Sequence, residues 1–334
     1  MIISRTPFRI SLFGGGTDYP QWYLNHGGAV LGFSINKYCY ISLRPLPPFF
    51  PHRHKVAYSQ VEEVEEISEI RHPAVRAVLT EHPVSHGISL HHESDLPART
   101  GLGSSSAFTV GLLNALAALR GRAMTERQLA EEAIRIEQQV IGEHVGSQDQ
   151  VWAAFGGCRR IDFSSDNRFS VLPVMMSVER RQALTGRLMM FFTGISRYAS
   201  DIARDKIKNL ERRADDLVVM REMVDTAQNI LQDGSRELGD IGRMLHEHWL
   251  LKRQLADKVS NQKVDEIYAE ALAAGAVGGK LLGAGGGGFM VFYVEPENQQ
   301  AVLDRLSGLI HVKFGLSLTG SRIVIYEPDG LENH

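Results

Sequence analysis

The sequence predicts an α+β protein of two domains, residues 1–185 and 186–334. A chain of 334 residues suggests about two domains at the usual ~100 to 200 residues each. The first hundred residues are mostly β-branched and aromatic runs separated by glycine and proline turns, which is typical of strands. The end of the chain alternates helical and strand patterns around a glycine cluster, which predicts helices packed on an antiparallel sheet.

Strands dominate the expected N-terminal part, at residues 8–13, 29–43 and 87–93. Four prolines between residues 45 and 51 predict a stiff, non-helical loop. From residue 104 to about residue 119 nearly every position is apolar or small. This stretch therefore predicts a helix that is buried on most sides.

A capping box marks the start of the next helix, because Thr125 is followed three residues later by Gln128. The helix should run to about Ile141. Beyond it we expect strands at 158–163, 169–174 and 188–193, then a largely helical stretch over 196–258. The last elements should be a helix at 263–274, strands at 279–282 and 289–294, a helix at 296–309 and strands near Lys313 and Ile323, an order that can form a split βαβ sandwich.

Composition narrows the classes of function. Lys and Arg number 36 against 39 Asp and Glu, and the net charge of −3 offers no overall basic surface, so nucleic acid is not an expected partner. No apolar run approaches the roughly 20 residues of a membrane span, and the N-terminus lacks a long apolar segment. We therefore expect no membrane partner and a cytoplasmic location. Cys39 and Cys158 have no metal or redox spacing and are expected to be buried.

Three glycine clusters lie near residues 14, 101 and 283. Glycine lets a backbone approach a ligand closely and adopt positive φ, although a single cluster is more often only a turn. The third cluster fits neither of two familiar nucleotide signatures. A Walker motif needs Ser or Thr after Gly-Lys, and here Leu281 follows Lys280. A dinucleotide-binding GxGxxG must open a helix, whereas a strand pattern begins at Phe289.

The second cluster is the stronger candidate for binding phosphate; it consists of Gly101, Leu102, Gly103, Ser104, Ser105 and Ser106. It precedes a helix whose first N–H groups have no intrahelical partner and whose dipole favours an anion. The three hydroxyls could also bind phosphate oxygens or Mg²⁺. The alternative is that the serines only cap the helix, which explains one serine better than three.

Two acidic residues are candidates for chemistry. Glu137 lies on the apolar stripe of its helix, four residues after Ala133 and four before Ile141. A carboxylate there needs either a basic partner or a metal ion, and the residues alone slightly favour the ion pair. Asp149 precedes an apolar run, and its simplest role is that of an N-cap.

Taken together, these motifs resemble those of the GHMP kinases, a superfamily of small-molecule kinases that includes galactokinase, homoserine kinase, mevalonate kinase and phosphomevalonate kinase. The counterparts are residues 6–19 (TPFRISLFGGGTDY), 96–106 (LPARTGLGSSS) and 280–289 (KLLGAGGGGF), in the order that the family has. The resemblance covers essentially the whole chain. It implies a domain like that of a ribosomal small-subunit protein followed by a ferredoxin-like domain, with the active site between them.

The resemblance also implies roles for single residues. In this family the second motif wraps the phosphates of ATP, its second serine, here Ser105, holds Mg²⁺ together with a helical glutamate, here Glu137, and an aspartate takes or orients the proton of the acceptor hydroxyl. Asp149 matches that aspartate. Arg9 matches a basic residue beside it, where a cation offsets charge that develops on the phosphoryl group.

The first motif bears on the acceptor. Galactokinase-like members have Glu-His where this chain has Gly15 and Gly16, so galactose is not expected, while Thr17 and Asp18 are kept and Asp18 should bind sugar hydroxyls. The pattern FGGGTDYP, with GSQDQ around Asp149, is most similar to the bacterial D-glycero-D-manno-heptose 7-phosphate kinases, which phosphorylate the anomeric hydroxyl to give the 1,7-bisphosphate. A fucokinase-like or other anomeric monosaccharide kinase is the alternative.

An acceptor that carries a phosphate needs cations. Arg197, beside the turn at Gly194, is the expected ligand of that phosphate, and Gly285 and Gly286 of the third motif are expected to contact the substrate. The other cations considered, Lys206, Lys208, Arg159 and Arg160, are more typical of solvated surface charges. A non-catalytic member that only binds a sugar phosphate is a remote alternative, which the complete set Arg9, Ser105, Glu137 and Asp149 argues against.

Overall fold

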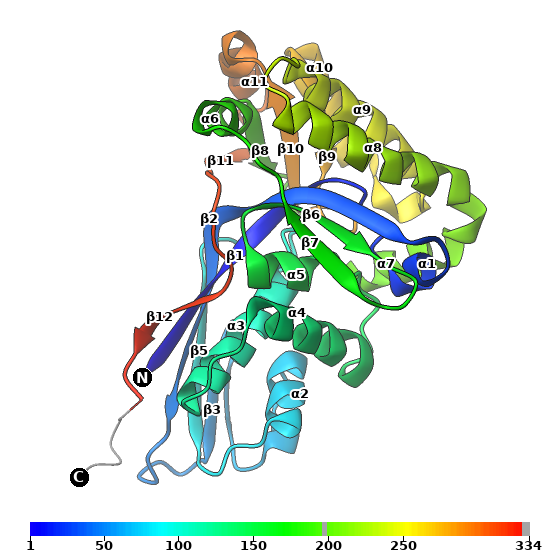
Figure 1. Ribbon diagram of the computed structural model, residues 1–334. Helices are drawn as coiled ribbons and strands as arrows, with labels where there is room; N and C mark the ends of the chain where they lie inside the picture. Colours follow the sequence, from blue (N-terminus) through cyan, green and yellow to red (C-terminus); the bar gives the residue numbers. More distant parts are fainter. Residues whose placement is uncertain (196–198, 329–334) are drawn as a thin grey trace.

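The computed structural model describes residues 1–195 and 199–328, which form two sheets with helices around them (Figure 1). The first sheet has eight strands, with β12-β1-β2-β5-β3-β4 as its main order and β6 joining β2 to β7. Its strands are β1 (Ile2–Phe13), β2 (Gly28–Pro45), β3 (His54–Ala57), β4 (Val61–Val64), β5 (Ile88–Ser94), β6 (Cys158–Phe163), β7 (Phe169–Pro173) and β12 (Arg322–Tyr326).

The helices that belong to this part of the chain include two that build the site, α3 and α5. Helix α3 packs against β1 and β2, and α5 packs against α3 and α4. The set is α1 (Pro20–His26), η1 (Ile67–Glu69), α2 (Pro73–Glu81), α3 (Ser104–Leu119), α4 (Glu126–Arg135), the π-helical turn η2 (Ile136–Val140), α5 (Gln148–Phe155) and α6 (Val178–Gly186).

The second sheet is antiparallel and has the order β11-β8-β10-β9. Its strands are β8 (Leu188–Phe192), β9 (Ala276–Leu281), β10 (Phe289–Val294) and β11 (Ile310–Val312). Figure 1 shows α8 to α11 gathered at this end of the molecule. The helical segments here are α7 (Ala199–Asn209), η3 (Glu211–Arg213), α8 (Ala214–Gln232), α9 (Gly239–Gln254), η4 (Asp257–Val259), α10 (Gln262–Ala273), η5 (Pro296–Asn298) and α11 (Gln299–Arg305).

Local sequence signals account for the elements that carry the site. The predicted capping box is present, since Thr125 and Gln128 each satisfy a backbone N–H of the other. The helix that begins there changes to a π-helical turn at Ile136 and ends after Val140. Such turns are rare and occur frequently at functional sites, and this one contains Glu137. Helix α3 is buried along most of its length, as its apolar sequence predicts.

The predicted α+β class is confirmed, and one long-range strand pairing is added. Strand β12 pairs antiparallel with β1, so the chain returns to the first sheet after completing the second (Figure 1). The backbone N–H of Glu327 donates to the carbonyl of Met1, which holds the two ends of the described chain side by side. The division between residues 185 and 186 stays a prediction.

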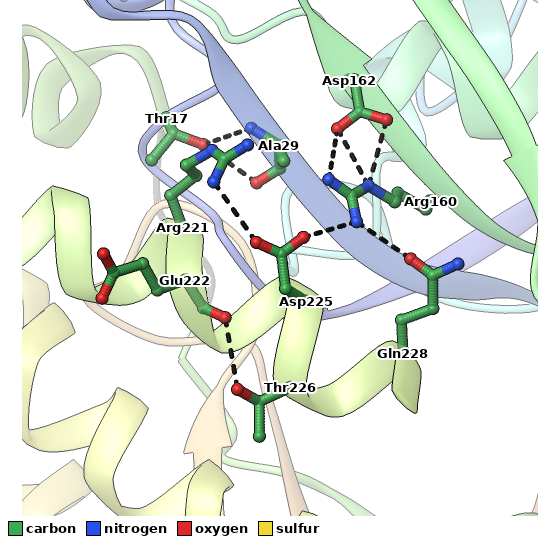
Figure 2. Close-up of polar contacts among 9 residues, drawn as sticks. All are labelled: Thr17, Ala29, Arg160, Asp162, Arg221, Glu222, Asp225, Thr226 and Gln228. Carbon is green, nitrogen blue, oxygen red and sulfur yellow. Dashed lines mark hydrogen bonds and ion pairs between the residues drawn. The ribbon is translucent and has the colours of Figure 1, made fainter. Parts of the chain in front are cut away.

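A polar network joins β6 to α8, as Figure 2 shows. The Arg160 guanidinium donates to Asp162 on its own strand at 2.9 Å and to Asp225 on α8 at 2.6 Å, and Gln228 accepts a third bond at 3.0 Å. Arg160 therefore ties the first sheet to a helix of the second half of the chain, and it is committed to these partners. Cys39 and Cys158 are both buried with free thiols. Within residues 1–195 and 199–328, no helix combines the length and apolarity that a membrane crossing needs.

Candidate active site

A pocket of about 1240 Å³ lies where the three sequence motifs meet. Its wall includes residues from both halves of the chain, from Arg9 on β1 to Gly283 after β9. The predicted site residues on this wall are Arg9, Gly15, Gly16, Asp18, Gly101, Gly103, Ser104, Ser105, Ser106 and Asp149. Folding thus brings most of the candidate residues into one cavity.

Arg9 and Asp149 form a bidentate ion pair at the centre of this group. Arg9 Nε donates to Asp149 Oδ1 and Arg9 Nη2 to Asp149 Oδ2, both at 2.8 Å. The Arg9 side chain is buried, whereas that of Asp149 is partly exposed to the pocket. Arg9 also donates from Nη1 to the Gly101 carbonyl at 2.6 Å, and its backbone N–H donates to the Leu102 carbonyl. One arginine therefore fixes both the carboxylate of Asp149 and the glycine loop.

The glycine loop presents the amino end of α3 to the pocket. Gly103 is the N-cap residue and has a left-handed conformation, with φ of 76°. The first-turn N–H groups of Ser104, Ser105 and Ser106 have no intrahelical acceptor, so together with the helix dipole they favour an anion. The Ser104 hydroxyl accepts from the Arg99 N–H at 3.1 Å, which braces the loop from its other side.

Glu137 lies directly behind this loop. Its Oε2 accepts from Ser106 Oγ at 2.9 Å and from Gln150 Nε2 at 2.5 Å, while its Oε1 has no hydrogen-bond partner among the described residues. Burial raises the pKa of Glu137 to about 7. Ser105, predicted to share a metal ion with Glu137, is exposed on the pocket wall, and the serine that contacts the carboxylate is Ser106. The metal role of Ser105 stays a prediction.

Asp18 lies on the wall formed by the loop after β1. Its Oδ1 accepts from the Gly16 N–H at 2.9 Å, and burial raises the pKa of the carboxyl. Gly146 packs so closely on Asp18 that a Cβ there would lie 1.9 Å from Oδ2. Two further polar atoms on this wall, Ser11 Oγ and Gln148 Oε1, are buried and have no hydrogen-bond partner among the described residues.

Five of the predicted residues that the structure describes lie off the pocket wall, and one of them is Glu137, behind the glycine loop. The Leu102 side chain is buried, and the Thr17 hydroxyl donates to the carbonyls of Gly14 and Ala29, the latter contact appearing in Figure 2. Gly285 and Gly286 pack on η4, where the Gly286 N–H donates to the Val259 carbonyl. Gly283 and Ala284 line the pocket in their place. Arg197 lies outside the described residues.

Sequence reasoning found no role for two lysines on the wall, and it gave too little weight to a third. Lys206 was assigned to the solvated background, and Lys252 and Lys280 were given no role, yet all three are buried and line the pocket. A signal was available for the two helical lysines. Lys206 follows buried Ala203 by three residues, and Lys252 follows buried Trp249 by three, which puts each on the inner face of its helix.

Aromatic rings border another part of the pocket. His72 stacks on Phe108 with ring centroids 4.5 Å apart, and His92 meets the same ring edge-on at 5.0 Å. Burial lowers the pKa of His72 to about 4, so its ring is neutral at pH 7. Residues 94–99 line this region, whereas Phe49 of the proline-rich loop is 86% exposed and is not on the wall.

The sequence of this chain is similar to those of known kinases. Residues 69–157 match the model of the GHMP kinases N terminal domain, and residues 226–310 match that of GHMP kinases C terminal. A D-glycero-alpha-D-manno-heptose 7-phosphate kinase of Campylobacter jejuni is 30% identical over 325 residues, which cover 91% of this chain and 93% of that protein.

A more distant relative and a solved structure extend the comparison. The bifunctional fucokinase/GDP-fucose pyrophosphorylase of Arabidopsis thaliana is 24% identical over 96% of this chain, which corresponds to 32% of that protein. The fold is shared with a D-glycero-D-manno-heptose 1-phosphate kinase from Bacteroides thetaiotaomicron, at a TM-score of 0.80 and 22% identity over 98% of this chain and 100% of that one. The chain therefore belongs to the GHMP kinase family and is a phosphotransferase that acts on an alcohol group.

Proposed function

We propose that this protein transfers the γ-phosphoryl group of ATP to the anomeric hydroxyl of D-glycero-D-manno-heptose 7-phosphate and forms the 1,7-bisphosphate. The observation that carries the proposal is the Arg9–Asp149 pair, which lies in one pocket with the amino end of α3 and with Asp18. A helix terminus for phosphate, a carboxylate for a hydroxyl proton and a cation beside it are the parts that phosphoryl transfer needs.

The pocket wall around α3 offers groups that would suit the phosphates and the base of ATP. The first-turn N–H groups of α3 would bind the phosphates, with Ser104 and Ser105 adding hydroxyl donors, while the Ser106 hydroxyl donates to Glu137. The flat rings of His72 and Phe108 would border the base, since stacked aromatic surfaces suit a planar heterocycle.

Mg²⁺ fits the donor set beside the loop. Glu137 offers a buried oxygen without a partner, and a bound cation would stabilise the carboxylate form that burial disfavours. The described residues hold no group of three or more His, Cys, Asp or Glu that could bind a metal. This suits Mg²⁺, which keeps water and phosphate oxygens and needs only one or two carboxylates from the protein. Glu137 with Ser105 or Ser106 would hold the ion, which when bound neutralises charge on the phosphates.

The acceptor side suits a polyhydroxylated molecule. Asp18, Ser11 Oγ and Gln148 Oε1 offer acceptors and a donor on one wall, and polar groups buried without a partner are costly unless a ligand satisfies them. A sugar hydroxyl next to Asp149 would give its proton to Oδ1 or Oδ2 as it attacks the γ-phosphorus. Arg9 would hold the carboxylate in place and offset charge on the transferring group.

An acceptor panel tests the proposed reaction. ADP release from Mg-ATP is measured with D-glycero-D-manno-heptose 7-phosphate beside mannose, fucose and galactose. We expect turnover with the heptose phosphate at least tenfold above that with the others, and a product that carries phosphate at the anomeric carbon by ³¹P NMR. Turnover with fucose or mannose alone would keep the kinase and reject the heptose phosphate. ATP hydrolysis with no preferred acceptor would contradict the proposal as a whole.

Gly283 provides a test of how the pocket is assembled. Its backbone touches the loop of the second motif, and a Cβ there would lie 2.4 Å from Gly101 Cα. Gly283→Ala is therefore expected to displace the phosphate loop and to raise KM for ATP by about tenfold, as overpacking of a tight contact does. Gly121→Ala is the matched control, because Gly121 has nearly the same φ, 65° against 67°, but faces open space. Equal effects of the two changes would assign the loss to backbone strain alone.

A further inference from the structure

Three buried lysines converge on the part of the pocket wall that holds Asp18. Lys206 comes from α7, Lys252 from α9 and Lys280 from β9, and their exposed fractions are 4%, 4% and 2%. Lysine is almost never fully buried unless it is paired, because an ammonium group loses its hydration there. Three buried lysines on one wall therefore require a nearby negative charge to stabilise their ammonium groups.

The described residues do not supply that charge. None of their carboxylates lies within salt-bridge distance of the three ammonium groups, although Asp18 interacts with each at longer range. Lys252 Nζ donates to the carbonyls of Leu281 and Gly283 at 2.6 and 2.7 Å, and Lys280 Nζ donates to that of Leu12 at 2.7 Å. These two lysines thereby hold the third-motif loop and the end of β1.

Lys206 differs from Lys252 and Lys280 because its ammonium group makes no hydrogen bond to any described residue. A structural hydrogen bond therefore does not explain why Lys206 is buried. Burial lowers the pKa of Lys206 to about 8, while burial and mutual repulsion lower the pKa of Lys252 and Lys280 further. His248, behind the lysines, has no partner for either ring nitrogen, and its pKa is lowered by burial and by the same three lysines. The wall therefore holds three buried amines whose charged forms are disfavoured, and no described carboxylate is close enough to form a salt bridge with them.

We propose that Lys206, Lys252 and Lys280 form the subsite for the phosphate group of the acceptor, and that they make the enzyme selective for a phosphorylated sugar. This inference rests on the proposed function for the reaction itself. A phosphate monoester carries about two negative charges and three acceptor oxygens at pH 7. Its charge would favour the ammonium forms of the three lysines, which burial and mutual repulsion disfavour, and it would give Lys206 the acceptor that it lacks.

The phosphate that binds there has two possible sources, the acceptor and the γ-phosphate of ATP. The position of the lysines favours the acceptor. Lys280 Nζ donates a hydrogen bond to the carbonyl of Leu12, which lies just before the loop of Gly15 and Gly16. Lys206 interacts electrostatically with Asp18, which follows that loop. The helix terminus expected to bind ATP is that of α3, and within the described chain none of the three lysines donates to it. Lys206 and Lys280 therefore belong to the side on which the acceptor hydroxyls are expected, while Lys252 bonds to Gly283, which packs on the second-motif loop.

Lys206→Met is the sharpest variant, since it removes the charge, keeps the length of the side chain and breaks no hydrogen bond between described residues. Its KM for D-glycero-D-manno-heptose 7-phosphate is expected to rise by on the order of 10- to 100-fold, the usual range for a charge-assisted bond, with KM for ATP unchanged. Lys206→Arg should restore part of the loss. Lys208→Met is the matched control, because Lys208 lies on the same helix with a side chain 68% exposed and only a distant partner, Asp205. It should behave as wild type.

Binding measured without ATP separates this inference from the proposed reaction. Calorimetric titration with the heptose 7-phosphate should show tight binding to the wild type and a 10- to 100-fold loss in Lys206→Met, whereas the dephosphorylated heptose should bind both proteins equally weakly. If no sugar is turned over but the phosphate-dependent loss is seen, the reaction is rejected and the subsite stands. An unchanged affinity for the phosphorylated sugar overturns the subsite, and a rise in KM for ATP alone reassigns the lysines to the nucleotide and also overturns it.

The same titration has an expected pH dependence. The groups that face Lys206 are Lys252 and His248 from α9, Lys280 from β9 and Asp18 from the loop after β1. The ammonium form of Lys206 is present below its pKa of about 8 and is lost above it, so affinity for the sugar phosphate should fall as pH rises through about 8. This fall should be absent from Lys206→Met. A fall of the same size in the variant would show that another group is responsible.

Discussion

Asp149→Asn is expected to lower kcat by roughly 10²- to 10⁴-fold, the range that a positioned general base contributes. The substitution keeps the shape of the side chain and one acceptor for Arg9 but removes the group that takes the hydroxyl proton. The proposed ATP site lies on α3 and its loop, which Arg9 continues to hold through the Gly101 carbonyl at 2.6 Å. The dissociation constant for ATP should therefore change by less than about threefold, which separates loss of chemistry from loss of binding.

The measurements are steady-state kcat with the heptose 7-phosphate and ATP affinity by calorimetry. Asp166→Asn is the matched control, because Asp166 also pairs with an arginine, Arg168, but in an exposed turn that is not on the pocket wall. It should leave kcat unchanged. A value of kcat for Asp149→Asn within a few-fold of wild type would remove Asp149 from the proposed role.

Glu137→Gln is expected to lower activity nearly as much as Asp149→Asn, but by weakening the binding of Mg²⁺ rather than by removing a proton acceptor. Glutamine matches glutamate in shape yet cannot supply the charged oxygen that a divalent cation requires, so the apparent affinity for Mg²⁺ should fall by at least about 10- to 100-fold. Because the side chain is buried and burial disfavours its charge, the neutral amide should not lower Tm in the absence of Mg²⁺. Activity should recover in part as the Mg²⁺ concentration is raised.

The readouts are Tm without metal and initial rates across a Mg²⁺ titration. Glu131→Gln is the control on the same helix, since Glu131 is exposed and pairs only with Arg127 at 3.3 Å. A Glu137→Gln protein with wild-type Mg²⁺ dependence would assign Glu137 a structural role in the network of Ser106 and Gln150.

Several features of the fold and site follow from local sequence alone. The capping box at Thr125, the helix after Gly103 and the strands at residues 158–163 and 289–294 were predictable because each depends on neighbouring residues. The candidate pair Arg9 and Asp149 was also predictable, since each lies within a contiguous motif. Their direct bond, which spans 140 residues, is what the structure adds.

Other features depend on how elements pack. Which serine meets Glu137 is decided by the rotation of α3 about its axis, and that rotation is set by the packing of α3 on β1, β2 and α5. The third-motif glycines Gly285 and Gly286 contact η4 rather than the pocket because of how η4 sits beside that loop. The pairing of β12 with β1 joins the two ends of the chain and leaves no local mark.

The sequence by itself determined the family and the chemistry, because the phosphate loop, the aspartate and the helical glutamate lie in short motifs whose composition is governed by backbone and helix geometry. Only the tertiary structure revealed that Lys206, Lys252 and Lys280 converge on one part of the pocket wall. A lysine on the inner face of a helix has the same sequence pattern whether its amine reaches solvent or meets two others, and residues 206, 252 and 280 lie on three separate elements. Their convergence is a property of packing between α7, α9 and β9, and the repulsion it creates is what points to a phosphate on the acceptor.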